Sequence, residues 1–514
     1  MSSELLVAGC GHDGRLGLGR EQNSSAWIKH PFFVGDNAPV RIFVGGFHSF
    51  VQTKQHAIYG FGLNQHGQLG LGESTAAVLA PRLVPFFKKG EDVADIRCGS
   101  YHTVALLRDG SVYVCGGNEH GQLGLGDRED RQHFTKLDIA PSPSSSSGSM
   151  DANTARSVMM VSAGTYHTLI GLCNVVLSEN GEKPRFYPFV VAACGNGDYG
   201  ELGYDPDSWD LLSEQERRVK QQVLQRSRNR AERSNGDGEG VGLVDDNWKA
   251  KFKSKVQVKA RRAAFSSPIF KPVRHPLLDA QSLDLSMTDR SCSNPHPAAP
   301  FELHSIEAMH LHSIIVVRDV AKHATVSHHF GCYFNGDIEG LESSRPTPSL
   351  CGDDGARYEL VHAGSDVAFG VRPLGNGADS IAVMGKGNLG AGDDDAFAPR
   401  WQPWPAPIGQ PIKLRRCVGK YHFFLWLDDV LTEPADAQAG TTTTSTPSIA
   451  ETKPPQRIRS HLLGFGDNLM GQLGANTDHS TITTPIPVLP PHTAIHDVQC
   501  GHRHSFVLIE RTPQ

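Results

Sequence analysis

The 514-residue sequence has no long apolar stretch, and no run approaches the ~18 apolar residues that a membrane-spanning helix needs. Residues 1–6 are also too short and polar to resemble the hydrophobic part of a secretory signal peptide. These absences predict a cytoplasmic protein without a membrane partner, with an additional nuclear pool left open. The net charge is only −6, which argues against a surface-wide affinity for nucleic acid.

The sequence also lacks the cysteine spacing of a zinc cluster. Its ten cysteines include no Cys-x-x-Cys pair and are spread along the chain. Four of them, Cys98, Cys115, Cys194 and Cys500, stand directly before a glycine in related segments. We therefore expect small buried core residues rather than metal ligands or redox groups, and we expect no cofactor.

The usual catalytic motifs are missing as well. The sequence has no Gly-x-Ser-x-Gly elbow, no P-loop lysine motif and no His-Glu-x-x-His helix. A pattern of the dinucleotide-binding type occurs at Gly9-x-Gly11-x-x-Gly14, but a true fingerprint opens a helix that receives the pyrophosphate, and here further turns follow. We therefore predict a protein that is not an enzyme, with no catalytic residues and with glycines that serve turns.

Glycine is what the sequence has in excess: 54 residues, more than a tenth of the chain, against a usual ~7%. The segment YGFGLNQHGQLGLG at 59–72 returns almost unchanged as YVCGGNEHGQLGLG at 113–126, which is 54 positions later. Two markers recur with this spacing. The first is Gly-x-x-His, with the histidines His48, His102, His167, His422 and His504. The second is Gly-x-Leu-Gly, which includes the glycine pairs Gly67 and Gly70, Gly121 and Gly124, and Gly471 and Gly474.

Weaker copies of the first marker, around His312 and Val367, bring the number of units to seven. Short segments rich in β-branched and aromatic residues, such as HTVALL and HSFVLIE, lie between the glycine turns and predict about four strands per unit. The chain starts and stops in the middle of a unit. We therefore predict an all-β, seven-bladed β-propeller that is closed by pairing of the N- and C-terminal strands.

The segment CGSYHTVALLRDGSVYVCGGNEHGQLGLGD at 98–127 resembles the repeat of the regulator of chromosome condensation family. This resemblance covers roughly 400 residues, is strong in the first three and last two units, and implies the family's seven-bladed propeller. In overall layout the chain is most similar to the fungal alpha-tubulin suppressor, or killer-toxin-insensitivity, type. That type implies a small zinc-binding electron-carrier protein as partner, in diphthamide synthesis and in Elongator-dependent modification of the tRNA wobble uridine.

The expected organisation has five parts. Residues 1–204 form the first propeller part, 205–300 a basic, partly helical or disordered insertion, and 301–428 degenerate propeller units. Residues 429–460 form a Thr/Pro-rich loop, and 461–514 close the propeller. The stretch 217–262 carries 14 Lys and Arg against 5 Asp and Glu, and the short helix is expected from Ser213.

Candidate contact residues follow from charge. Four lysines of the basic insertion, Lys249, Lys251, Lys253 and Lys255, are candidates for a partner or nuclear-import contact. Stacking aromatics are scarce there, which argues against nucleic acid. Asp393 and Asp394 either belong to a solvated turn or to an acidic docking surface. The recurrent histidines lie on too wide a circle to share one metal ion, and we expect each to bond to the backbone of a neighbouring blade.

Three functions remain open. The first is a non-catalytic scaffold or regulatory subunit, acting as a monomer inside a heteromeric complex. The second is guanine nucleotide exchange on Ran or another small GTPase. The third is an adaptor propeller in ubiquitin ligation or cytoskeletal regulation. All three have protein partners, and the small zinc protein and the GTPase are the two named alternatives.

Overall fold

The computed structural model describes residues 3–87, 92–139, 154–176, 185–197, 201–203, 267–273, 301–309, 312–319, 324–331, 343–348, 358–364, 367–374, 376–387, 389–390, 396–404, 411–430, 459–490 and 493–510. These residues form β-strands and two 3-10 helical turns, η1 His12–Gly14 and η2 Gly35–Asn37. Within these described ranges, no helix is long and apolar enough to cross a membrane.

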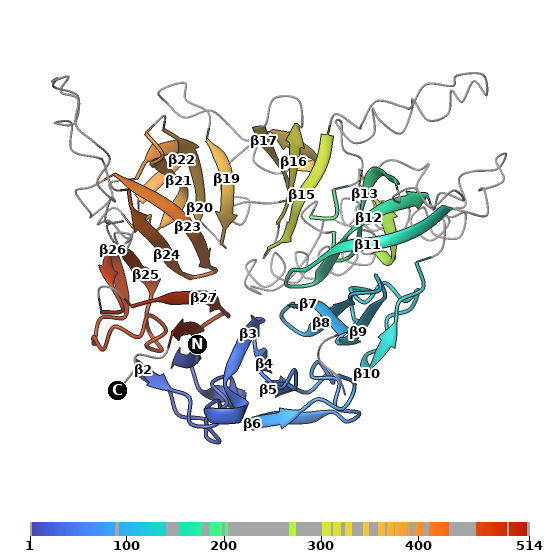
Figure 1. The fold of residues 1–514 in the computed structure, drawn as a ribbon, viewed down its shortest axis with the longest axis horizontal. Coiled ribbons are helices and arrows are strands. Elements are labelled where there is room, and N and C mark those ends of the chain that lie inside the picture. Colours follow the sequence, from blue (N-terminus) through green and yellow to red (C-terminus); the bar gives the residue numbers. More distant parts are fainter. Residues whose placement is uncertain are drawn as a thin grey trace, which may run out of the picture.

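The strands form seven four-stranded antiparallel sheets, six of which use consecutive strands of the chain. Figure 1 shows the sheets placed around a common centre. The first sheet consists of β3 Pro39–Val44, β4 His48–Thr53, β5 Ile58–Asn64 and β6 Thr75–Leu83. The second consists of β7 Val93–Cys98, β8 His102–Leu107, β9 Val112–Gly116 and β10 Arg131–Lys136. The third consists of β11 Thr154–Ala163, β12 His167–Val176, β13 Arg185–Gly195 and β14 Ser267–Pro272.

The fourth sheet consists of β15 Phe301–Ala308, β16 His312–Asp319, β17 Ala324–Gly331 and β18 Ser343–Pro348. The fifth consists of β19 Glu359–Ala363, β20 Val367–Pro373, β21 Asp379–Gly387 and β22 Ala396–Pro403. The sixth consists of β23 Ile412–Gly419, β24 His422–Asp429, β25 Ser460–Asp467 and β26 Thr481–Pro487. The seventh sheet combines both ends of the chain. It consists of β27 Ile495–Cys500, β28 His504–Glu510, β1 Ser3–Gly9 and β2 Ser24–Lys29, in the order β2-β1-β28-β27.

The two ends of the chain meet in this seventh sheet. Strand β1 runs antiparallel to β28, with Leu6 opposite Val507 and Val7 opposite Phe506. Val7 and Phe506 are fully buried, so the pairing contributes apolar contacts as well as backbone hydrogen bonds. Each sheet contacts the next one around the centre, and the seventh sheet contacts the first through β27, β28 and β3. The prediction of an all-β propeller is confirmed.

The apolar core lies between neighbouring sheets. Its largest fully buried side chains include a phenylalanine from the second strand of several sheets, such as Phe50, Phe424 and Phe506. Phe61 in β5 packs 5.9 Å, ring centre to ring centre, from Phe506 in β28, which joins the first and seventh sheets. The short apolar segments of the repeat are therefore strands whose side chains are buried on both sides between neighbouring sheets.

Two predicted boundaries need correction. Residues 205–300 are not all insertion, because Ser267–Pro272 forms β14, which pairs with β13 as the outer strand of its sheet. The repeat marker is absent from this segment, and an outer strand needs only a few side chains that fit its neighbour. The loop assigned to 429–460 is shorter at both ends, because Asp429 still belongs to β24 and Ser460 begins β25.

The degenerate units in 301–428 form two sheets of four strands each, β15 to β18 and β19 to β22, before β23 begins. The helix expected from Ser213 and most of the basic insertion lie outside the described residues. The lysines Lys249, Lys251, Lys253 and Lys255 and the carboxylates Asp393 and Asp394 lie outside them as well.

Candidate functional site

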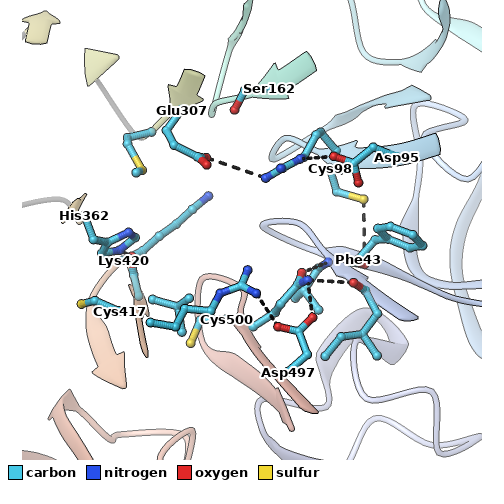
Figure 2. A pocket seen from close by; sticks show the side chains of 18 of the residues that line it. Phe43, Asp95, Cys98, Ser162, Glu307, His362, Cys417, Lys420, Asp497 and Cys500 are labelled. Atoms are coloured by element: carbon cyan, nitrogen blue, oxygen red, sulfur yellow. Dashed lines mark hydrogen bonds and ion pairs between the residues drawn. The ribbon is translucent and has the colours of Figure 1, made fainter. Parts of the chain in front are cut away.

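A central cavity of about 730 Å³ lies where the first strands of all seven sheets converge. Strands β3, β7, β11, β15, β19, β23 and β27 all contribute lining residues. Cavities of this volume hold small-molecule ligands in many proteins. Figure 2 shows that the lining is rich in charged side chains and thiols, which come from opposite sides of the ring.

Part of the charge in this lining joins one sheet to another. Arg97 in β7 bonds to Asp95 of the same strand at 2.7 Å and reaches Glu307 in β15 at 3.7 Å. Arg41 in β3 lies 3.4 Å from Asp95. Burial works against the charged form of Arg97, but Glu307 and Asp95 outweigh it and raise the pKa of Arg97. These ion pairs therefore connect three sheets across the cavity wall.

The seventh sheet is joined to its neighbours by polar contacts of the same kind. The amide nitrogen of Gln499 in β27 donates to the carbonyl of Ile42 at 2.7 Å, and its amide oxygen accepts from the backbone N–H of Val44 at 3.0 Å. On the other side, Arg416 in β23 bonds to Asp497 in β27 at 2.5 Å. Hydrogen bonds and an ion pair thus hold the seventh sheet between β23 and β3, in addition to apolar packing.

Three cysteines, Cys98, Cys417 and Cys500, line the cavity. Burial raises the pKa of the Cys98 and Cys417 thiols, and it raises that of Cys500 to about 12. All three are therefore neutral and poorly nucleophilic at pH 7. Cys115 and Cys194 are buried core residues, as expected, whereas Cys98 and Cys500 are partly buried: they pack against the core and also line the cavity.

Lys420 follows β23 and also lines the cavity. Figure 2 shows its side chain extending toward the middle of the space. Burial lowers the pKa of Lys420 to about 8, although Cys98 opposes this fall. His362, whose Nε2 lies 2.7 Å from the carbonyl oxygen of Gly419, stands beside it in the lining. Burial lowers the pKa of His362 to about 4, although the hydrogen bond to Gly419 opposes this fall. The ring is therefore neutral at pH 7, and its Nε2–H donates to the carbonyl oxygen of Gly419.

The recurrent histidines connect neighbouring sheets from buried positions. His48 Nε2 lies 2.8 Å from Thr103 Oγ1, which donates to the carbonyl of Gln68 at 2.7 Å. A hydroxyl has a single proton, so His48 must donate the other bond, and its ring is the neutral form protonated at Nε2. Burial lowers the pKa of His48 to about 3, which agrees with this assignment.

The same contact recurs at other junctions between sheets. The bonds are His102 Nε2 to Thr168 Oγ1 at 2.9 Å, His167 Nε2 to Ser313 Oγ at 2.9 Å and His422 Nε2 to Ser505 Oγ at 2.7 Å. The sequence predicted bonds to neighbouring backbone, and this is corrected: the histidine bonds to a hydroxyl, and at three junctions that hydroxyl then bonds to backbone. His504 differs, because neither ring nitrogen has a hydrogen-bond partner among the described residues.

The marker glycines lie in the turns that follow the third strand. All six glycines of the three pairs named above have positive φ, between 63° and 78°. At Gly474 a Cβ atom would lie 2.4 Å from the ring of Trp27 in β2, and at Gly70 equally close to the ring of Phe134 in β10. These turns need glycine both for backbone conformation and for the approach of the neighbouring outer strand.

Five aromatic side chains form a continuous arc over one end of the ring. We define this aromatic arc as Phe47, Tyr101, Tyr166, Tyr421 and His502. Ring centres lie 5.8 Å apart for Tyr101 and Tyr166, 5.1 Å for Phe47 and Tyr101, 4.5 Å for Phe47 and His502, and 6.0 Å for Tyr421 and His502. Tyr421 is 38% exposed and the other four are partly exposed.

The arc crosses five sheets because each member lies in the loop between the first and second strands. The guanidinium of Arg15 packs 4.5 Å from the centre of the Phe47 ring. His66 and His120, in the turns after the third strands, extend the arc by contacts with Tyr101 and Tyr166. Sequence reasoning missed the arc, although an aromatic residue precedes the recurrent histidine in four units.

The arrangement of sheets and the apolar contacts between them define the class of protein: an all-β propeller built from repeats. Models of the regulator of chromosome condensation (RCC1) repeat match residues 55–106, 109–170 and 460–508, and a second model of this repeat matches residues 93–122. The chain therefore contains repeats of the regulator of chromosome condensation type within an all-β propeller.

Several relatives share part of this chain. A segment of 103 residues is 44% identical to the human X-linked retinitis pigmentosa GTPase regulator and covers 20% of this chain and 10% of that protein. Another of 147 residues is 33% identical to the secretion-regulating guanine nucleotide exchange factor of Bos taurus and covers 29% of this chain and 26% of that protein. The chain thus spans about a tenth of the length of the first of these relatives and about a quarter of the second.

The fold is similar to that of Prp20p from Saccharomyces cerevisiae. The two structures superpose with a TM-score of 0.57 at 14% sequence identity, over 100% of this chain and 92% of that one. At this identity the likeness concerns the fold alone.

Proposed function

We propose that this protein is a non-catalytic interaction propeller whose aromatic arc binds a protein partner. The single observation that carries the proposal is the run of partly exposed aromatic rings across five sheets. Tyrosine and phenylalanine are enriched at the centre of protein interfaces, because a rigid ring gives a large contact area at low entropic cost. The rings also lie on loops, which can vary without disturbing the sheets.

Affinity purification tests this proposal directly. We expect the wild-type protein to recover a reproducible partner, and the double variant Tyr101→Ser with Tyr166→Ser to lose it at an unchanged melting temperature. Leu83→Ser is the matched control, because Leu83 is 51% exposed but belongs to the outer strand β6, away from the arc. Equal recovery by the double variant and the control would exclude the arc as the docking surface.

For the identity of the partner we propose the small zinc-binding electron-carrier protein of the killer-toxin-insensitivity type, and with it a role in diphthamide synthesis and Elongator-dependent tRNA modification. The support is the resemblance in overall layout described above, together with the pairing of β1 and β28 in one sheet. Co-purification from cells checks it: zinc content and mass of the recovered partner identify such a protein, and a partner without zinc excludes it. We propose a cytoplasmic location, which imaging of a tagged chain checks.

A second candidate function is nucleotide exchange on a small GTPase. It is favoured by the similarity to the bovine secretion-regulating guanine nucleotide exchange factor and by the fold of Prp20p, which has been described together with its binding to Gsp1p and histones. Release of labelled GDP from purified Ran decides between the candidates. Exchange requires acceleration by orders of magnitude, and unchanged release leaves the scaffold function.

A further inference from the structure

The central cavity has more positive than negative charge. Five cationic side chains, Arg41, Arg97, Arg415, Arg416 and Lys420, line it together with three carboxylates, Asp95, Glu307 and Asp497. Each of these carboxylates already has a guanidinium partner, as described above. Arg415 is paired with Asp428, which lies outside the lining.

Lys420 is the cation of this lining for which the described residues provide no carboxylate within ion-pair distance. Its neighbours in the lining do not supply a negative charge either. His362 is neutral and donates its Nε2 proton to Gly419, and the thiols of Cys98, Cys417 and Cys500 keep their protons at pH 7. An ammonium group removed from water without a counter-ion is unfavourable, and a bound anion would relieve this cost.

The environment of Lys420 fits a small ligand. The cavity volume of about 730 Å³ is within the range of small-molecule sites. The lysine remains partly exposed, so solvent and small solutes reach it. Arg97 and Arg416 lie in the same lining, and their side chains are 40% and 41% exposed although both bond to carboxylates. They can add hydrogen bonds to the oxygens of an anion.

We propose that the central cavity is a binding site for a small solute that carries a carboxylate or phosphate group, with Lys420 as the residue that binds this group. Burial of Lys420 in the cavity without a counter-ion lowers its pKa. An anion that binds beside the ammonium group will therefore raise that pKa. A negative charge within 4–6 Å shifts a pKa by about 1 to 3 units. This proposal is independent of the partner that occupies the aromatic arc.

The test uses the full-length chain with its lysines reductively ¹³C-methylated, so that NMR reports the pKa of each amine. The resonance of Lys420 is the one that is missing from the Lys420→Arg variant. We expect it to titrate near pH 8 in sodium chloride and about 1 unit or more higher at saturating phosphate or succinate of equal ionic strength. A response to phosphate, to succinate or to both supports the site and identifies the group it prefers.

Lys413 is the matched control, because it lies on the same strand β23 but is exposed and outside the cavity lining. Its ¹³C resonance should show no difference between the three salts. A Lys420 pKa that stays constant in phosphate and succinate overturns the proposal, and so does an equal shift at Lys413, which would show general screening by salt. The Lys420→Arg variant should keep the wild-type melting temperature in chloride and lose the stabilisation that the anion gives.

Discussion

The histidine contacts between sheets can be tested with one isosteric substitution, Thr103→Val. The hydroxyl of Thr103 accepts from His48 Nε2 and donates to the carbonyl of Gln68, and all of these groups are fully buried. Valine keeps the shape of the side chain and removes both bonds. The His48 N–H then has no acceptor, whereas the Gln68 carbonyl keeps a weaker contact with the thiol of Cys115 at 3.4 Å.

The expected cost follows from this difference between the two partners. An unsatisfied buried donor costs about 1–3 kcal/mol, and a lost hydrogen bond whose acceptor remains partly satisfied costs about 0.5–1.5 kcal/mol. We therefore expect Thr103→Val to lower the free energy of unfolding by roughly 2–4 kcal/mol. Thr103→Ser should lose far less, since it keeps the hydroxyl, and serine stands at the equivalent positions Ser313 and Ser505.

The assay is urea unfolding, followed by circular dichroism and by tryptophan fluorescence. Thr135→Val is the surface control: Thr135 makes a single bond, to the His133 carbonyl at 3.2 Å, and is only half-buried, so a loss of about 0.5 kcal/mol or less is expected. If Thr103→Val and Thr135→Val have the same urea midpoint, or if Thr103→Ser is as damaging as Thr103→Val, the contacts do not join the sheets as described.

Three more predictions concern the ring. Gly474→Ala should cost about 1–3 kcal/mol more than Gly35→Ala in urea unfolding, because both have positive φ but only Gly474 lies against Trp27; equal costs would contradict this. Deleting residues 1–20 removes β1 from the seventh sheet, so the cooperative thermal transition should be lost, and a wild-type melting temperature would show that the sheets do not act as one closed ring. Acid should destabilise the protein: His48 has a pKa of about 3 when folded and about 6.5 when unfolded, so the unfolded chain binds more protons between these values. Its stability contribution is complete above pH 6.5 and falls by up to about 1.4 kcal/mol per pH unit toward pH 3, and a urea midpoint that is unchanged from pH 7 to pH 5 would refute this.

The strands were predictable because their periodicity is local. HTVALL became β8 and HSFVLIE became β28, since short apolar runs rich in β-branched and aromatic residues between glycine turns are typical of buried strands. Strand β14 was missed because it has no repeat marker and is an outer strand that is distant in sequence from β13. The correct pairing there depends on which chain segment reaches the edge, and composition does not encode that.

The candidate site was harder to predict because its parts meet only in the folded ring. Lys420 and Arg97 are 323 positions apart in the chain, and nothing in either segment indicates that they share a cavity. The place of Cys98 and Cys500 in the cavity lining was not predictable for the same reason, since the first strand of a sheet borders both the core and the cavity. The aromatic arc, by contrast, has a signal in the sequence, because an aromatic residue directly precedes the marker histidine in four units, although His502 does not follow this pattern.

The distribution of polar groups explains how this fold separates architecture from recognition. The buried histidine and hydroxyl pairs connect neighbouring sheets at four junctions, with groups that only the correct neighbour satisfies. The loop between the first and second strands bonds to the next sheet through its backbone, as between the Gly46 N–H and the Gly99 carbonyl at 2.9 Å, so its side chains can differ between units. In the sixth sheet this loop places Lys420 in the cavity and Tyr421 in the arc, on adjacent residues. A partner on the arc and an anion in the cavity would therefore meet at one loop, and any coupling between the two sites is reciprocal, so that each ligand changes the affinity for the other by the same factor.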